Sequence, residues 1–126
     1  MATIAKLSEV VLDCPDPQAL ARFYTQLTGW QVTHSDDEWC SIGPTDGARP
    51  RLSFQRAPGY RPPVWPDPGS SMQFHLDFKV DDLDTAERGA IELGASKFDE
   101  QPSPTNFRVL ADPVGHPFCL CLSQSP

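Results

Sequence analysis

The chain has 126 residues, of which 39% are hydrophobic and 21% charged, and its formal net charge is −7. This length suits one domain with its own core, and the composition is typical of soluble globular proteins. The negative charge argues against nucleic acid or an anionic membrane as a main partner. No apolar run is long enough to span a bilayer, and the first residues lack the features of a signal peptide. We therefore expect a cytoplasmic protein.

Four cysteines occur, at positions 14, 40, 119 and 121, and their spacing matches neither a zinc ribbon nor a C-x-x-C redox motif. In a cytoplasmic protein we expect them to be reduced. Cys119 and Cys121 are two residues apart on a predicted strand and cannot easily bridge to each other. Cys14 and Cys40 are interpreted as small buried hydrophobic residues.

The first half of the chain predicts the order β-α-β-β-β. Residues 5–14 contain an alternating strand, after which Asp16 is a helix N-cap and Pro17 the first helical residue. Apolar residues follow at helical spacing until Gly29, which ends the helix. Further strands are expected at residues 30–34, 39–42 and 51–56, with a loop at residues 43–50.

The second half predicts the same order after a connector, residues 58–71, that holds five of the fourteen prolines. Residues 73–80 (QFHLDFKV) alternate strictly, which is typical of a strand with one buried face, here carrying Phe74. Asp82 caps the helix that follows, and Gly94 ends it. The remaining strands are expected at residues 97–100, 106–111 and 118–122.

This internal repeat predicts an α+β fold in which two tandem βαβββ units pair to form a curved, mixed-sheet cleft. We expect a single domain over residues 1–126, with units at residues 5–57 and 72–123 and the connector at residues 58–71. Pseudo-twofold symmetry makes Glu9 the counterpart of His75, and Gln55 the counterpart of Cys119.

Strand parity places a set of polar side chains on the inward faces of four strands. Convergent polar groups in a concave site are the usual starting hypothesis for a functional site. The set is Glu9 from the first strand, Arg51, Ser53 and Gln55 from the fourth, His75 and Asp77 from the fifth, and Cys119 and Cys121 from the eighth.

Several members of this set have two interpretations. His75 is either a metal or pocket ligand or a hydrogen-bonded cleft histidine. Asp77 orients another group or forms a salt bridge. Glu9 is either a general base or a carboxylate paired with Arg51 or Arg56. Trp65, in the connector, could pack on a core edge, close a pocket or meet a second chain, and the first role is favoured.

The sequences HLDFKVDDLDTA (residues 75–86), LGA (93–95) and LADPVGHPFCLCL (110–122) resemble the vicinal oxygen chelate superfamily, and most of all its glyoxalase-like and bleomycin-resistance-like branch. The resemblance covers residues 7–122. It implies a cleft in which a divalent metal is chelated by adjacent oxygens of a substrate, and it makes a homodimer the expected assembly.

Carried over by position, the metal ligands that the resemblance implies are Glu9, Gln55, His75 and Cys119. Cys119 stands where metal-dependent members usually carry a glutamate. A hard cation prefers oxygen ligands, whereas thiolate, imidazole and carboxylate together suit Zn²⁺ better. Zn, Ni, Mn and Fe remain alternatives for a divalent metal, beside the interpretation of Cys119 as a buried apolar residue.

Two classes of function follow. The incomplete ligand set favours metal-free binding or sequestration of a flat or aromatic small molecule, with aromatic residues available for stacking. The alternative is a metal-dependent lyase or isomerase that acts on vicinal oxygens, with Glu9 and His75 as catalytic residues. The candidate ligand-binding residues are Trp39, Arg51, Gln55, Trp65 and Asp77.

Overall fold

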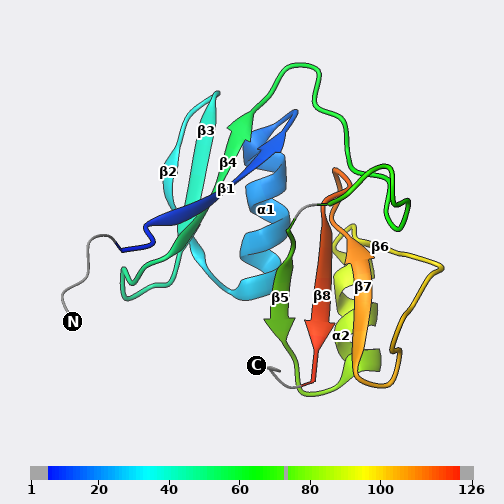
Figure 1. The fold of residues 1–126 in the computed structure, drawn as a ribbon. Coiled ribbons are helices and arrows are strands. Elements are labelled where there is room, and N and C mark those ends of the chain that lie inside the picture. The colour runs from blue at the N-terminus through cyan, green and yellow to red at the C-terminus, as the bar shows by residue number, and fades with distance from the viewer. Residues whose placement is uncertain (1–5, 73, 123–126) are drawn as a thin grey trace, which may run out of the picture. The chain divides into compact units, whose positions relative to one another are not determined.

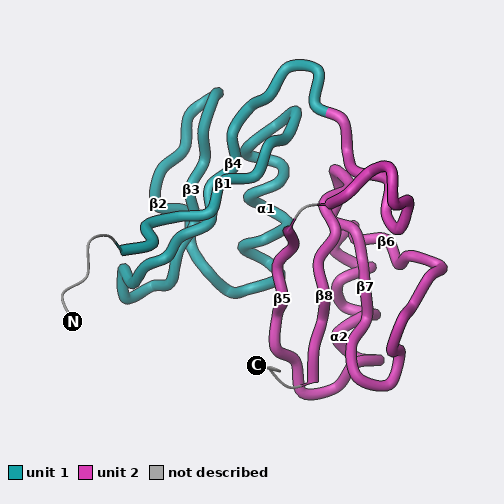
Figure 2. Tube along the Cα trace, in the orientation of Figure 1, with its two compact units in different colours: residues 1–60 teal, residues 61–126 magenta. Residues whose placement is uncertain are grey.

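A computed structural model describes residues 6–72 and 74–122 of the chain. Two compact units divide the chain, residues 1–60 and residues 61–126 (Figure 2). In its described part, each unit has one helix and one four-stranded mixed sheet (Figure 1). The predicted α+β fold with two tandem βαβββ units is therefore confirmed. None of the helices in residues 6–72 and 74–122 is long and apolar enough to cross a membrane.

Unit 1 has its strands in the spatial order β1-β4-β3-β2. The β1–β4 pair is parallel, and the β4–β3 and β3–β2 pairs are antiparallel. The helix packs on one face of this sheet, where the ring of Tyr24 stacks on that of Phe54 at a centroid distance of 5.5 Å. The elements are β1 (Glu9–Cys14), α1 (Pro17–Thr28), β2 (Gln31–Ser35), β3 (Trp39–Gly43) and β4 (Arg51–Arg56).

The ends of α1 are those that the sequence predicts. One carboxylate oxygen of Asp16 accepts hydrogen bonds from the backbone N–H groups of Gln18 and Ala19, at 3.1 and 3.3 Å. These bonds satisfy two of the N–H groups that a helix leaves unpaired at its start. At the other end Gly29 has a φ of +76°, and its N–H donates to Thr25 O at 2.8 Å. A residue without Cβ adopts this left-handed conformation at little cost.

Unit 2 repeats the arrangement with the strand order β5-β8-β7-β6. The β5–β8 pair is parallel, and the β8–β7 and β7–β6 pairs are antiparallel. The elements are β5 (Leu76–Lys79), α2 (Leu83–Glu92), β6 (Ser96–Lys97), β7 (Phe107–Ala111) and β8 (Pro117–Cys121).

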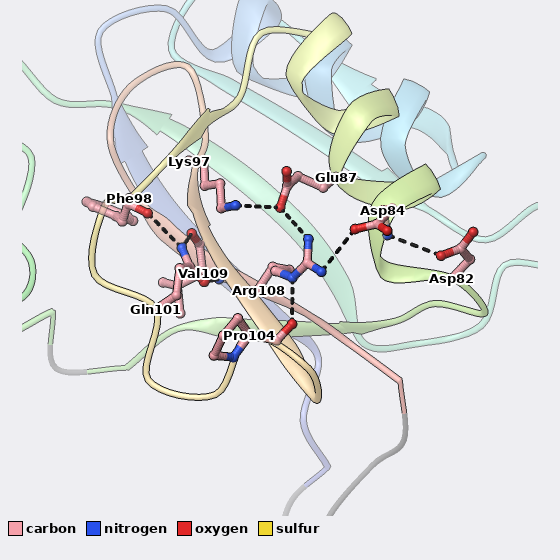
Figure 3. Close-up of polar contacts among 9 residues, drawn as sticks. All are labelled: Asp82, Asp84, Glu87, Lys97, Phe98, Gln101, Pro104, Arg108 and Val109. Atoms are coloured by element: carbon pink, nitrogen blue, oxygen red, sulfur yellow. Dashed lines mark hydrogen bonds and ion pairs between the residues drawn. The ribbon is translucent and has the colours of Figure 1, made fainter.

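An arginine on β7 connects α2 to the sheet (Figure 3). The Arg108 guanidinium donates to Glu87 at 2.8 Å and to Asp84 at 3.0 Å, both on α2, and to the carbonyl of Pro104 at 2.7 Å. Lys97 lies 3.3 Å from the same Glu87 carboxylate. Burial alone would raise the pKa of Glu87, but the hydrogen bonds from Arg108 and Lys97 outweigh it and lower the pKa. The pair therefore fixes the helix to the sheet with both partners charged.

Two predicted strands of unit 2 are shorter in the structure. The strand predicted at residues 97–100 is limited to Ser96–Lys97, because a side chain takes over the edge of β7 beyond it. The Gln101 amide donates to the carbonyls of Phe98 and Val109, both at 2.8 Å, and accepts from the N–H of Val109 at 2.9 Å. A side-chain amide thus supplies the bonds that a longer strand would have made.

The strand predicted at residues 73–80 begins only at Leu76. Phe74 lies before it and is 65% exposed, so its predicted place on the core face is wrong. The β5–β8 register pairs Leu76 with Phe118, so the next position of β8 is Pro117. Proline has no N–H with which to extend the ladder. Gln73, the first residue of the prediction, lies outside the described residues.

Candidate functional site

Three ligand-type side chains meet on one face of the unit 2 sheet. The parallel register places Asp77 of β5 directly opposite Cys119 of β8. His75 comes two residues before Asp77, and its Nε2 lies 3.1 Å from Asp77 Oδ1. One ligand atom from each of the three residues lies within 4.8 Å of the other two. We call His75, Asp77 and Cys119 the donor cluster.

The members of the donor cluster differ in exposure and charge. His75 and Asp77 are exposed, whereas Cys119 is only 5% exposed. Burial, followed by the nearby charges of Asp77 and Cys121, raises the pKa of the Cys119 thiol to about 12. The thiol also hydrogen-bonds to Asp77, which stabilises its protonated form. Cys119 is therefore a neutral thiol at pH 7, held beside a carboxylate.

A chain of hydrogen bonds crosses the sheet of unit 1 on the face opposite α1. The indole Nε1 of Trp39 donates to Ser41 Oγ at 2.9 Å, and Ser41 Oγ lies 2.7 Å from Ser53 Oγ. The Ser53 hydroxyl donates to Glu9 Oε1. We call these four residues the Glu9 chain. Because an indole N–H only donates, each hydroxyl can accept one bond and pass one on, in the direction that ends at the Glu9 carboxylate.

The two serines of the Glu9 chain are buried, with Ser53 fully enclosed and Ser41 7% exposed. Buried hydroxyls without partners are costly, so the continuous chain is what allows them at these positions. Its consequence for the site is that Glu9 Oε1 is held in one orientation. No hydrogen bond to Glu9 Oε2 is found among residues 6–72 and 74–122, so that oxygen is the acceptor which Glu9 can offer to a ligand.

Arg51 lies opposite Glu9 in the β1–β4 register. Its side chain passes over Gly43, and its Nε is buried without a hydrogen-bond partner in the described part of the chain. Arg56, the other predicted partner of Glu9, instead lies 3.5 Å from Glu38. Within the same described residues no ion pair joins Glu9 to either arginine. Glu9 and Arg51 therefore lie opposite each other on this face without a direct ion pair.

Gln55 does not reach Glu9. The register pairs Gln55 with Asp13, four residues beyond Glu9, and the Gln55 amide donates to the Asp13 carboxylate at 3.0 Å. Four residues of strand correspond to roughly 13 Å. The chain brings Ser53 to Glu9 in place of Gln55. Within unit 1, Glu9 and Gln55 therefore lie too far apart to hold one metal ion together.

The registers also revise the expected symmetry. Glu9 is aligned with His75, so the residues two positions further along are Val11 and Asp77. Val11 pairs with Ser53 in unit 1, and Asp77 pairs with Cys119 in unit 2. The counterpart of Cys119 is then Ser53, and that of Gln55 is Cys121. Strand parity predicts the face on which Ser53 lies, but it does not predict the hydrogen bonds of Ser53 to Ser41 and Glu9. The His-x-Asp spacing, which places both side chains on one face of the strand, is the sequence signal that points to Asp77 as a member of the donor cluster.

Other predicted site residues have structural contacts. Trp65 of the connector packs edge to face on Phe98, with ring centroids 4.9 Å apart, in agreement with a role at the edge of the core. Trp39 is the first donor of the Glu9 chain. Cys14 and Cys40 are buried, as predicted, and all four cysteines are free thiols.

These features can be compared with known proteins. Residues 9–121 match the glyoxalase-like domain family. The chain therefore belongs to this family, and its fold is that of the vicinal oxygen chelate superfamily, as the sequence motifs predict. No curated protein matched the sequence significantly.

Solved structures with this fold are distant in sequence. A glyoxalase/bleomycin resistance protein/dioxygenase family enzyme from Burkholderia phytofirmans PsJN superposes with a TM-score of 0.71 at 20% identity, over 92% of this chain and 97% of that one. A fosfomycin resistance protein from Mesorhizobium loti gives 0.67 at 17%, over 97% and 94%. A bleomycin resistance determinant encoded on transposon Tn5 gives 0.57 at 21%, over 96% and 100%. At these identities the likeness concerns the fold alone.

Proposed function

We propose that this protein binds and sequesters a small molecule, and that binding does not depend on a metal held jointly by the two units. The observation that carries the proposal is the Glu9 chain. One oxygen of Glu9 is already bonded to Ser53, and Gln55 is bonded to Asp13 on another part of the face. Of the two donors that a shared metal would need from unit 1, Gln55 is therefore engaged at Asp13, and Glu9 keeps one free oxygen.

The side chains around Glu9 indicate the chemistry of the ligand. Glu9 Oε2 offers an acceptor, Arg51 offers a guanidinium, and Trp39 offers an aromatic surface that its anchored indole holds in place. Such a combination suits a small oxygenated molecule with an aromatic or flat part, since a few polar groups fix the orientation and the ring supplies contact area. A bleomycin resistance determinant and a fosfomycin resistance protein share this fold, which supports a ligand that is not a macromolecule.

A second candidate function is a metal-dependent lyase or isomerase acting on a substrate with vicinal oxygens. The donor cluster of His75, Asp77 and Cys119 is the observation that favours it. A divalent metal, when bound, would polarise the substrate oxygens. Glu9, with its orientation fixed through Ser53, would take a proton from a carbon next to a carbonyl, and His75 would stay with the metal.

Calorimetric titration of chelator-treated protein tests the proposal, with fosfomycin, bleomycin and a panel of small aromatic hydroxy acids as probes. We expect at least one probe to bind without added metal, and we expect Glu9→Gln and Arg51→Met to weaken that binding. Glu38→Gln is the matched control, because Glu38 is an exposed carboxylate next to Arg56 in the same unit. Binding that appears only after a divalent metal is added, and disappears in His75→Ala, would support the enzyme instead.

The proposal includes two further points, a homodimer and a cytoplasmic location. Light scattering coupled to gel filtration should give twice the mass of one chain, and a fluorescent fusion should distribute throughout the cytoplasm. A monomeric mass at micromolar concentration would contradict the first point.

A further inference from the structure

We propose that unit 2 by itself binds a thiophilic divalent cation, with Zn²⁺ as the best-fitting ion, through His75, Asp77 and Cys119. The inference goes beyond the proposed function, which needs no metal. It also differs from the ligand set implied by the resemblance, because it uses Asp77 and takes no ligand from unit 1.

The backbone already positions the three donors. Asp77 and Cys119 face each other across a parallel pair of strands, where neighbouring strands lie about 4.8 Å apart. His75 reaches the same point because residues i and i+2 of an extended segment project to the same side. The resulting separations are 3.1 Å between His75 Nε2 and Asp77 Oδ1, and no more than 4.8 Å for the other pairs.

These separations are close to those of a bound ion. Bond lengths of about 2.0–2.3 Å in a tetrahedral zinc site place the ligand atoms roughly 3.4–3.8 Å from one another. Small side-chain rotations of the exposed His75 and Asp77 can close the remaining distance, while the buried Cys119 keeps its place in β8. The ion would then take its ligands largely as the fold presents them.

The chemistry of the donors selects the class of ion. Imidazole nitrogen, carboxylate oxygen and a sulfur ligand are the combination found at zinc sites, whereas Mg²⁺, Ca²⁺ and Mn²⁺ favour sets made of oxygen. Binding replaces the S–H bond of Cys119 by an S–metal bond, and the proton leaves to solvent. The buried sulfur of Cys119 distinguishes this site from an exposed histidine and aspartate that merely lie close together.

Three protein ligands leave the fourth position of a tetrahedral ion open. Cys121 is two residues further along β8, opposite Lys79, and thus roughly 7 Å from Cys119 along the strand. It lies too far away to serve as a fourth ligand without a change in the strand. The open position would therefore take water or an oxygen of a small molecule, as in zinc sites that are not purely structural.

Titration of the full chain with Co²⁺, followed by displacement with Zn²⁺, tests this site, because a cobalt–thiolate bond gives a charge-transfer absorption that oxygen and nitrogen ligands do not give. We expect one Co²⁺ per chain, with this band, and its loss when Zn²⁺ is added. Cys119→Ser should abolish the band. His75→Ala and Asp77→Asn should each weaken binding by more than about tenfold, since even a lost outer-shell partner costs that much.

Matched controls separate this site from the shared ligand set and from a folding defect. Cys121→Ser changes the other thiol of β8 and should keep both the band and the affinity. Glu9→Gln and Gln55→Ala should also leave Co²⁺ binding unchanged, and a loss in either would show that unit 1 supplies ligands. If Cys119→Ser does not fold, X-ray absorption of Zn²⁺ bound to Cys121→Ser replaces it, because Cys119 is then the remaining thiol of β8 and should give one sulfur ligand at about 2.3 Å. A wild type without the thiolate band, or a bound Zn²⁺ without a sulfur ligand, would overturn the inference.

Discussion

Replacing Ser53 by alanine tests whether the Glu9 chain is one cooperative unit. Ser53 is fully buried and stands in the middle of the chain, where it accepts from Ser41 and donates to Glu9. The substitution leaves the Ser41 hydroxyl buried without its acceptor. A buried polar group that loses its partner costs about 1–3 kcal/mol. Glu9 is only half-buried, so water can replace the lost donor there, and we expect a total loss of about 2 kcal/mol.

The double variant Ser41→Ala/Ser53→Ala makes the reasoning quantitative. Removing both hydroxyls leaves no stranded serine, so the double variant should be less destabilised than the sum of the single variants by about 1 kcal/mol. Urea unfolding followed by circular dichroism, at one pH for all four proteins, measures the free energies of unfolding. Strict additivity, or a Ser53→Ala variant as stable as the wild type, would refute a continuous chain that ends on Glu9.

Three further outcomes are expected. Because the pKa of Glu87 is lowered, its bonds stabilise the fold above the ordinary glutamate pKa of about 4.3 and lose that effect as the pH falls through the lowered value. Glu87→Gln should therefore cost about 1 kcal/mol of stability at pH 7. In urea titrations of both proteins, this difference in stability should shrink below pH 4. With a pKa of about 12, roughly one Cys119 thiol in ten thousand is ionised at pH 8. Mass spectrometry should therefore find Cys119 unmodified by iodoacetamide in the native protein and alkylated in urea. Rapid labelling of the native protein would count against the burial of Cys119. Gly115 has a φ of +98° and a Cβ there would overlap Pro62, whereas Gly29 has a φ of +76° and open space around it. Gly115→Ala should lose about 1–3 kcal/mol more stability than Gly29→Ala, because overpacking adds to the backbone cost that both share. Equal melting temperatures of the two variants would argue against the contact with Pro62.

Much of the fold was predictable because the signals are local. Asp16, Gly29 and Asp82 end or begin helices through side-chain and backbone preferences that act within a few residues. Alternation also assigned Ser53 and Asp77 to the correct faces. These signals lie within single elements, which is why the boundaries of α1 and the bounds of β4 needed no revision.

The pairing of groups across strands was harder to predict, because it depends on register. The loop at residues 43–50 leaves the alignment of β4 on β1 undetermined in sequence, and a shift of two residues preserves parity while exchanging Ser53 for Gln55 beside Glu9. The same limit applies to the end of β6, where the Gln101 side chain replaces a strand partner. No residue pattern within the strand signals such a replacement.

The central claim is that a small molecule binds on the face of the unit 1 sheet that carries Glu9, without a metal held jointly by the two units. The most direct measurement is a ¹H–¹⁵N NMR titration of chelator-treated protein with the tightest probe from calorimetry. The account predicts saturable shifts of the Trp39 indole and of the Ser53 and Arg51 amides, unchanged when Zn²⁺ is added and lost in Glu9→Gln. Shifts that occur only after a metal is added, and that are centred on His75 and Cys119, would contradict it.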